Sequence, residues 1–114
     1  MSLENPPPTS SGRLMLIATL RAKPGKEEPL GALIKQVQDR ANSEEEPGTF
    51  TYRVTRRIDA EGKRLSDFVI VEEYAGAAGI KEHTAAAPFK NMIQTAQEQG
   101  LMNGEVLIDF LDEL

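Results

Sequence analysis

Apolar residues in the first third of the chain follow the pattern of a strand and then that of a helix. Residues 14–20 (LMLIATL) are almost uniformly apolar, which in a strand means that neither face meets water. Within residues 27–42 the apolar positions instead recur every three or four residues, as on one face of a helix. Pro29 suits the first turn of such a helix, where a missing N–H costs little. We predict a strand at 14–20 and a helix at 27–42.

The middle of the chain has the pattern of a β-hairpin. Residues 49–58 alternate bulky apolar side chains with threonines and arginines, as a half-buried strand does. A polar stretch around a glycine follows at 59–64, and residues 67–74 (DFVIVEEY) are again extended and apolar. We expect these two strands to pair with each other.

The last third predicts two helical pieces and a closing strand. Ile80 and His83 share one helical face that runs up to Pro88, and a second apolar stripe follows this proline. Because proline interrupts the hydrogen bonding of a helix, we predict a kink at Pro88. Gly100 is a natural helix stop, and residues 106–111 (VLIDFL) predict the last strand.

The resulting order, βαββαβ, is that of a ferredoxin-like α+β fold with an antiparallel sheet and both helices on one face. The strands are apolar on both sides, so the second face would leave a larger apolar patch than single soluble domains expose. We therefore expect a second copy to cover it and form a homodimer. Residues 1–12, with three consecutive prolines, predict a disordered leader, and residues 13–114 predict a single domain.

Charge and composition exclude several classes of function. The chain has 114 residues with 13 Lys and Arg against 18 Asp and Glu, a net charge of −5. An acidic surface is a poor partner for nucleic acid or an anionic membrane. With no cysteine and one histidine, the chain has too few ligands for a conventional zinc site. There is neither a membrane span nor a secretory signal pattern, so we expect a cytoplasmic protein with no nucleic-acid or membrane partner.

Four short motifs resemble a known family. They are PGKEE at 24–28, EPGTFTY at 46–52, Glu73-Tyr74, and EHTAAAPF at 82–89. Their order and spacing are similar to those of the antibiotic biosynthesis monooxygenases, a family of dimeric α+β barrels, over about residues 13–112. The resemblance implies a homodimer with a pocket between sheet and helices in each subunit. It also implies oxidation of phenols, quinols or polyketide aromatics by O2, without a metal or flavin cofactor.

His83 and Tyr52 are the candidate catalytic residues. His83 is the only histidine, and its position is one where the resemblance implies a pocket histidine. A neutral imidazole could remove a phenolic proton, although a buried histidine satisfied by a hydrogen bond is an equally good interpretation. Tyr52 could donate a hydrogen bond to a developing oxyanion, with Phe50 on the same side of the strand as a pocket wall. For both aromatic residues, simple core packing is the favoured alternative.

Further candidates for the substrate pocket are Tyr74, Glu73, Phe89 and Met92. Phe89 and Met92 would line an apolar cavity just beyond the kink, unless they are ordinary helix packing. Glu73 or its neighbour Glu72 could orient His83 or form an ion pair between subunits. The charged clusters, among them residues 44–46 (EEE), are interpreted as solvated edges.

The sequence therefore favours a monooxygenase that acts on a small phenolic, quinol or polyketide-like substrate and needs no cofactor. A dimeric domain that binds a hydrophobic metabolite without turning it over is the alternative. A haem-degrading enzyme is less favoured, because residues 17–19 offer no asparagine and the chain has no tryptophan, both of which the resemblance implies for that chemistry.

Overall fold

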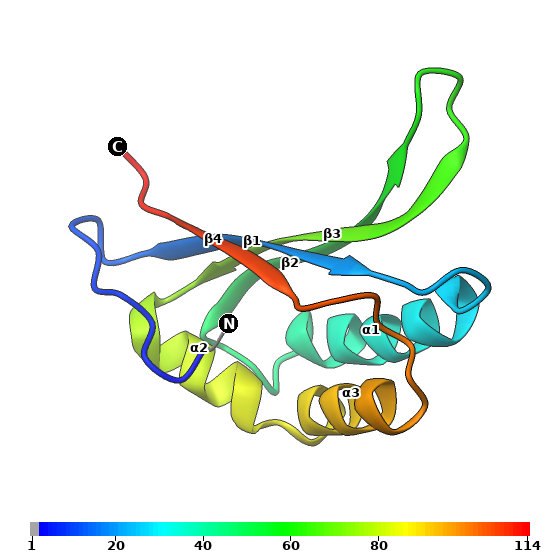
Figure 1. Ribbon diagram of the computed structural model, residues 1–114. Coiled ribbons are helices and arrows are strands. Elements are labelled where there is room, and N and C mark those ends of the chain that lie inside the picture. The colour runs from blue at the N-terminus through cyan, green and yellow to red at the C-terminus, as the bar shows by residue number, and fades with distance from the viewer. Residues whose placement is uncertain (1–2) are drawn as a thin grey trace.

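The computed structural model describes residues 3–114, and residues 1 and 2 lie outside this description. The described part contains four strands and three helices (Figure 1). In chain order these are β1 (Leu14–Arg21), α1 (Glu27–Ala41), β2 (Thr49–Ile58), β3 (Arg64–Tyr74), α2 (Gly76–Ala85), α3 (Ala87–Glu98) and β4 (Leu107–Leu111). The ferredoxin-like α+β fold is confirmed, with α2 and α3 in the place of the second helix.

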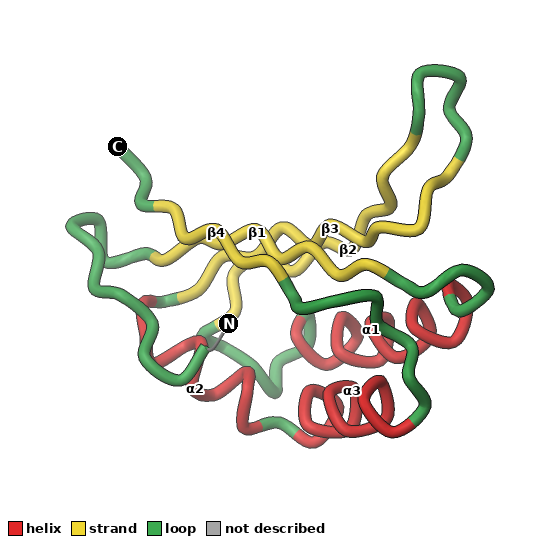
Figure 2. Tube along the Cα trace, viewed as in Figure 1, coloured by secondary structure: helices red, strands yellow, loops and turns green. Residues whose placement is uncertain are grey.

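The sheet has the strand order β2-β3-β1-β4, and every neighbouring pair is antiparallel. Strands β2 and β3 form the predicted hairpin. All three helices cover the same face of the sheet, and no helix of residues 3–114 lies on the other face (Figure 2). This two-layer arrangement places the hydrophobic core between β1 and β3 on one side and the helices on the other.

Strand β1 shows how alternation builds this core. Its even-numbered residues, such as Leu14 and Leu16, are buried against the helices, and its odd-numbered residues, such as Ile17, lie on the opposite face. Helix α1 meets them with the buried stripe predicted from its spacing. Burial of one such leucine or isoleucine contributes about 1.5–3 kcal/mol. The core is completed by Leu30, Ile34, Val37, Ile70, Ile80 and Leu101.

The face without helices is apolar at its centre. We call it the open sheet face and define it by seven residues that share one side of the pleat in the observed register. Leu107 and Leu111 at its β4 edge are about half exposed, and the others are partly buried. The β2–β3 hairpin bends away from the helices on this side of the sheet, as Figure 1 shows. The seven residues are Met15, Ile17, Thr19, Val69, Val71, Leu107 and Leu111.

Helices α2 and α3 are separate because of Ala86 and Pro88. Ala86 has extended backbone angles, φ −70° and ψ 146°, and Pro88 stands in the first turn of α3, where its missing N–H leaves no helical bond unmade. The predicted division into two helical pieces is confirmed, and the break lies at Ala86, two residues before Pro88. It allows α3 to lie alongside α1, while α2 lies below the sheet, directly after the end of β3 and far from the tip of the hairpin (Figure 2).

The described part of the N-terminal segment, residues 3–12, contains neither helix nor strand. It is nevertheless attached to the domain at both ends. Leu3 packs against the core, whereas the sequence predicts no packing here. The backbone N–H of Ser10 and the hydroxyl of Ser11 donate hydrogen bonds to the carboxylate of Asp112, at 2.8 and 2.6 Å. Among the described residues, none of the helices has the length and apolar character needed to cross a membrane.

Candidate active site

A cavity of about 520 Å³ lies between the helix-covered face of the sheet and helices α2 and α3. Most of its wall is aliphatic or aromatic, which is typical of a site for a small apolar ligand. The polar side chains in the wall are few and come from the sheet, from α2 and from the N-terminal segment. The lining residues are Leu3, Glu4, Ala18, Leu20, Tyr52, Ile70, Glu72, His83, Thr84, Phe89, Met92, Ile93, Val106 and Ile108.

His83 occupies the centre of an aromatic cluster at this cavity. Its side chain projects from α2 toward the sheet and is only 1% exposed. The imidazole centroid lies 5.1 Å from the ring centroid of Tyr52 and 5.4 Å from those of Tyr74 and Phe89. The fold thus brings together side chains from β2, β3, α2 and α3, four of the seven sequence-based candidates.

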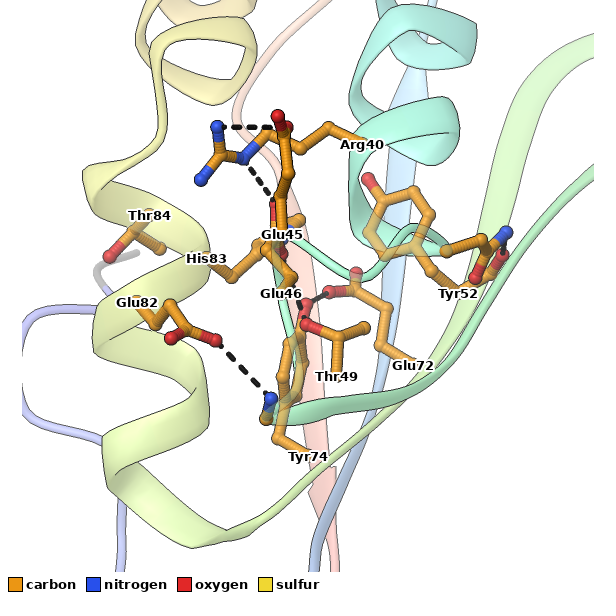
Figure 3. Close-up of polar contacts among 12 residues, drawn as sticks. Arg40, Glu45, Glu46, Thr49, Tyr52, Glu72, Tyr74, Glu82, His83 and Thr84 are labelled. Atoms are coloured by element: carbon orange, nitrogen blue, oxygen red, sulfur yellow. Dashed lines mark hydrogen bonds and ion pairs between the residues drawn. The ribbon is translucent and has the colours of Figure 1, made fainter.

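His83 is held by a buried carboxylate, that of Glu46 (Figure 3). Glu46 lies in the loop between α1 and β2, is 2% exposed, and its Oε1 is 2.7 Å from His83 Nδ1. Its other oxygen accepts a hydrogen bond from Arg40 Nε at 3.1 Å. Thr49 Oγ1 also donates to Glu46 Oε1, at 3.0 Å. A carboxylate can only accept, so this contact assigns the proton of the neutral imidazole to Nδ1.

The second imidazole nitrogen is therefore available as a base. His83 Nε2 makes no hydrogen bond to any residue of the described part. Across residues 3–114, every side-chain nitrogen or oxygen that is fully enclosed has a hydrogen-bond partner. Since Nε2 has no such partner, it is not fully enclosed, and it borders the cavity that His83 lines. Burial lowers the pKa of His83 below its ordinary value, against the opposing effect of Glu46. The imidazole is neutral at pH 7 and its Nε2 lone pair can accept a proton.

Two glycines allow Glu46 and His83 to meet. Gly48 lies two residues after Glu46, and Gly79 lies one helical turn before His83. A Cβ on Gly79 would stand 2.5 Å from the carbonyl oxygen of Gly48, so only glycine permits this approach of backbone to backbone. The N–H of Gly48 donates to Glu82 Oε1 at 3.2 Å, and its carbonyl accepts from Ala75 N at 2.9 Å. These contacts fix the α1–β2 loop against α2.

Tyr52 places a hydroxyl beside His83. The side chain is buried, lies on the helix-covered face of β2, and its hydroxyl makes no hydrogen bond to another described residue. By the same reasoning as for His83 Nε2, this hydroxyl borders the cavity. Burial, followed by the carboxyls of Glu72 and Glu46, raises the pKa of Tyr52 well above its ordinary value. The phenol stays protonated and can donate a hydrogen bond.

Glu72 is the second carboxyl of the cavity. It is 4% exposed on the same face of β3 and accepts a hydrogen bond from the hydroxyl of Tyr74. Burial raises the pKa of Glu72 to about 8, although the hydrogen bond from Tyr74 works in the opposite direction. Tyr74 itself is fully buried behind Glu72 and is not part of the cavity wall. Its role here is to hold Glu72.

The family is decided by comparison with known sequences. Residues 13–95 match the family model described as antibiotic biosynthesis monooxygenase. The chain belongs to this family. A comparison with curated proteins finds no significant match. Within residues 3–114 of this antibiotic biosynthesis monooxygenase family member, no three His, Asp or Glu side chains are grouped closely enough to hold a metal ion.

Solved structures of similar proteins have the same fold. A Caulobacter crescentus protein, provisionally described as an antibiotic biosynthesis monooxygenase, is 26% identical with a TM-score of 0.74, over 90% of this chain and 91% of that one. A Pseudomonas aeruginosa protein is 24% identical with a TM-score of 0.76, over 90% and 94%. A Mycobacterium tuberculosis protein is 22% identical with a TM-score of 0.72, over 90% and 95%.

Besides Tyr74, two more of the predicted pocket residues of this family member lie outside the cavity. Glu73 lies on the open face of the sheet and forms an ion pair with Arg13, at 2.6 Å, because adjacent residues of a strand face opposite sides. Phe50 is also elsewhere: a register shift between Thr49 and Thr51 breaks the alternation, so Phe50 does not share the side of Tyr52. Its ring is 48% exposed, with the Arg13 guanidinium 4.8 Å from the centroid.

Glu46 is the residue of this site that the sequence did not reveal. The sequence interpretation of residues 44–46 as a solvated edge is correct for the exposed Glu44 and Glu45 and wrong for Glu46. The one available signal is its place directly before Pro47-Gly48, in a motif that carries the family resemblance. Phe89 and Met92 lie in the cavity wall.

Proposed function

We propose that this chain is a monooxygenase that oxidises a small phenolic, quinol or polyketide-like aromatic substrate with O2. The observation that carries the proposal is the unpaired Nε2 of His83 at the wall of an apolar cavity, with Nδ1 fixed by Glu46 at 2.7 Å. A volume of about 520 Å³ lies within the range of sites that enclose small ligands. Membership of the antibiotic biosynthesis monooxygenase family supports the same class of reaction.

In the proposed reaction, the protein moves one proton and the substrate supplies the electrons. His83 Nε2 removes a proton from the bound ring, and the resulting anion is electron-rich enough to react with O2. With an anthrone-type substrate, a CH2 group and O2 give a C=O group and one water. The carbon loses four electrons, and O2 gains them. Tyr52 donates a hydrogen bond to the anion, and the apolar wall excludes bulk water.

The positive charge that forms on His83 has a ready counter-charge. Once Nε2 is protonated, the imidazolium remains bonded to the Glu46 carboxylate, which Arg40 and Thr49 hold in place. This arrangement favours the proton transfer, because the low-polarity surroundings strengthen the attraction between the two charges. Glu46 is therefore a positioning residue, and His83 is the base.

We also propose that two copies associate through the open sheet face. Its central residues Ile17 and Val71 are paired across β1 and β3 and carry no covering helix within the single chain. Burial of apolar area at about 25 cal/mol per Å² favours association. The exposed β4 residues Leu107 and Leu111 lie on the same side of the sheet, with the exposed Asp109 between them and opposite Ile17.

Oxygen uptake tests the function. Purified protein is mixed with dihydroxynaphthalenes and with anthrones, and O2 consumption is followed with an electrode. We expect uptake by the wild type, and incorporation of one atom of labelled O2 into the product. His83→Gln should reduce uptake at least a hundredfold, as loss of a general base does. Lys81→Gln, an exposed change on the same helix, is the matched control and should have no effect.

Equal uptake by the wild type and His83→Gln would refute the role of His83. Tight binding of these aromatics with no uptake by the wild type would refute the oxygenase function, and would indicate a domain that binds a hydrophobic metabolite. Circular dichroism of each variant shows that a loss of uptake is not a loss of fold.

A further inference from the structure

Glu72 is a carboxyl without a counter-ion in the wall of the cavity. It lies opposite Tyr52 on β2 and opposite Leu16 on β1, all on the helix-covered face of the sheet. No ion pair among the described residues includes it, and Arg40, the arginine of the site, is bonded to Glu45 and Glu46. A buried carboxylate with no cation beside it is costly, so the protonated acid is the stable form in this place.

The proton of this acid points to the cavity. Glu72 Oε1 is occupied, since it accepts the hydrogen bond from the Tyr74 hydroxyl. Oε2 makes no hydrogen bond to any described residue. Every fully enclosed side-chain oxygen of residues 3–114 has a hydrogen-bond partner, so Oε2 is not fully enclosed. Oε2 therefore borders the cavity. With Oε1 serving as acceptor, the acid carries its O–H on Oε2, where a bound ligand can receive it.

The cavity thus offers one acceptor, His83 Nε2, and two donors, the Tyr52 hydroxyl beside it and the Glu72 O–H. His83 Nε2 is an acceptor on the α2 side, and the Glu72 O–H is a donor on the sheet side. Everything between and beyond them is mainly apolar. A ligand that satisfies both His83 and Glu72 carries a hydroxyl or acidic C–H for His83 and, at another position of the ring system, an oxygen that accepts from Glu72. A carbonyl oxygen does so without adding a further O–H that needs a partner of its own.

We propose that Glu72 is a specificity-determining residue that, as a neutral acid, donates a hydrogen bond to a carbonyl oxygen of the ligand. The ligands of this cavity are then aromatic ketones, such as anthrone-type or hydroxyketone ring systems, in preference to rings that bear hydroxyls alone. The inference rests on the proposed function for the aromatic nature of the ligand. During turnover the same hydrogen bond stabilises the oxyanion, which forms on the carbonyl oxygen when His83 takes the proton.

Several other ionisable groups face Glu72, and a pH experiment must distinguish their ionisation from that of Glu72. Tyr52 and Tyr74 lie beside it on the sheet, His83 faces it from α2, Glu46 from the α1–β2 loop, and Glu4 lines the same cavity from the N-terminal segment. The pKa of His83 is lowered, and those of both tyrosines are raised. Glu72, with a pKa of about 8, ionises between pH 7 and 9.5, and the variants below assign the pH effect to it.

Binding of a ketone and its hydrocarbon tests the proposal without any turnover. The probes are α-tetralone, which has one carbonyl and does not ionise in this range, and tetralin, which lacks the carbonyl. Affinities are measured by calorimetry or NMR under nitrogen at pH 7 and 9.5. We expect the wild type to bind α-tetralone about tenfold less tightly at pH 9.5, since ionised Glu72 cannot donate, and tetralin equally at both pH values.

Glu72→Gln is the decisive variant, because its amide reproduces the acid: the oxygen accepts from Tyr74 and the NH2 donates into the cavity. It should bind α-tetralone at both pH values as tightly as the wild type does at pH 7. Glu4→Gln, a matched change of another carboxyl in the same wall, should keep the pH dependence of the wild type. Glu72→Leu should lose the preference for ketone over hydrocarbon at both pH values.

Equal pH dependence in the wild type and Glu72→Gln would overturn the proposal, and so would equal affinity of the wild type for the two probes at pH 7. Neither result depends on oxygen chemistry. A wild type that binds the ketone as expected but consumes no O2 leaves the role of Glu72 intact and refutes the oxygenase function instead. Since glutamine is isosteric with the acid, this variant also keeps the test valid if Glu72→Leu fails to fold.

Discussion

The Oε1 atom of Glu46 and the Nδ1 atom of His83 lie 2.7 Å apart, although 37 residues separate the two in sequence. The contact connects the loop after α1 with helix α2 and completes a chain that runs from Arg40 through Glu46 to the imidazole (Figure 3). It fixes the tautomer in which Nε2 is free to act as a base.

Glu46→Gln should disturb this tautomer and reduce activity without removing the histidine. A glutamine can offer either its oxygen or its NH2 to Nδ1, so the Nδ1-protonated form is no longer enforced. Because the chain has a single histidine, ¹⁵N-detected NMR reports its tautomer directly. We expect a mixture of tautomers in the variant and at least a tenfold fall in kcat for O2 uptake, with KM little changed.

Glu45→Gln is the control for this experiment. Glu45 is next in the chain, is exposed, and pairs with the same Arg40 at 3.3 Å, but does not touch His83. Its amide should leave both the tautomer and the uptake unchanged. A Glu46→Gln variant with the tautomer and kcat of the wild type would show that Glu46 does not position the histidine.

His83 should make the protein less stable in acid. Burial lowers its pKa in the folded state, whereas the unfolded chain has the ordinary value near 6.5. Below pH 6.5 the unfolded state binds more protons than the folded state, so this contribution to the free energy of unfolding falls as the pH falls. Urea unfolding at pH 7.5, 6 and 5 measures it. The decline should be smaller in His83→Gln, and equal declines would contradict the prediction.

Glu72 should have the opposite effect on stability, between pH 4.5 and about 8. Its pKa is raised to about 8, above the value of 4.5 for the unfolded chain, so the folded state holds the proton more tightly. The associated stability is complete below pH 4.5 and is lost as the pH rises through 8. The slope in this window is about 1.4 kcal/mol per pH unit at most.

The variant Glu72→Gln removes this pH dependence. Its free energy of unfolding should exceed that of the wild type increasingly from pH 5 to pH 9, measured by urea titration. Glu73→Gln changes the neighbouring carboxyl, which lies on the other face with Arg13, and should keep the slope of the wild type. The prediction fails if the two variants show the same slope.

The alternation and spacing of apolar residues predict most of this fold. The period of two in β2 from Tyr52 onward, the helical stripe of α1 and the helix break just before Pro88 are local properties that the sequence predicts. The same patterns place His83 on the buried side of its helix, because its spacing from Ile80 is one turn. Local periodicity therefore predicts which elements form and which face of each is buried.

The site is less predictable, for reasons that the residues make clear. Strand β3 is apolar on both faces, so its pattern does not say whether Glu72 or Glu73 points inward. The register shift at Phe50 changes which side of the sheet this residue faces, so simple alternation along β2 assigns it to the wrong side. The sequence of β2 alone does not reveal this shift. Glu46 is identified as functional only by its contact with His83, and this contact depends on how a loop and a distant helix pack together.

Gly79→Ala tests the close approach that brings that loop and helix together. Alanine favours a helix over glycine by about 1 kcal/mol, but here its Cβ would lie 2.5 Å from the carbonyl oxygen of Gly48. Backbone must move, so we expect a net loss of about 1–3 kcal/mol in the free energy of unfolding and a shift of the His83 NMR signals.

Gly31→Ala is the matched control in α1. Its Cβ would meet only the ring edge of Phe68, at 3.1 Å, and this side chain can turn slightly. The change should be neutral or mildly stabilising and should leave the His83 signals in place. If Gly79→Ala behaved in the same way, the contact between Gly48 and Gly79 would not be what positions α2.

Val71→Lys tests the association of two copies through the open sheet face. Val71 lies at the middle of this face, between Ile17 on β1 and Arg53 on β2, where the single chain leaves it without a covering helix. A lysine there can reach water in the single chain, so the fold should tolerate it. In a dimer it would bury two like charges beside the two Arg53 side chains, which disfavours association. Sedimentation should therefore give twice 12.5 kDa for the wild type and 12.5 kDa for Val71→Lys, with Gln36→Lys on the exposed side of α1 as the unaffected control. A wild type that sediments as a single copy at micromolar concentration would refute the association.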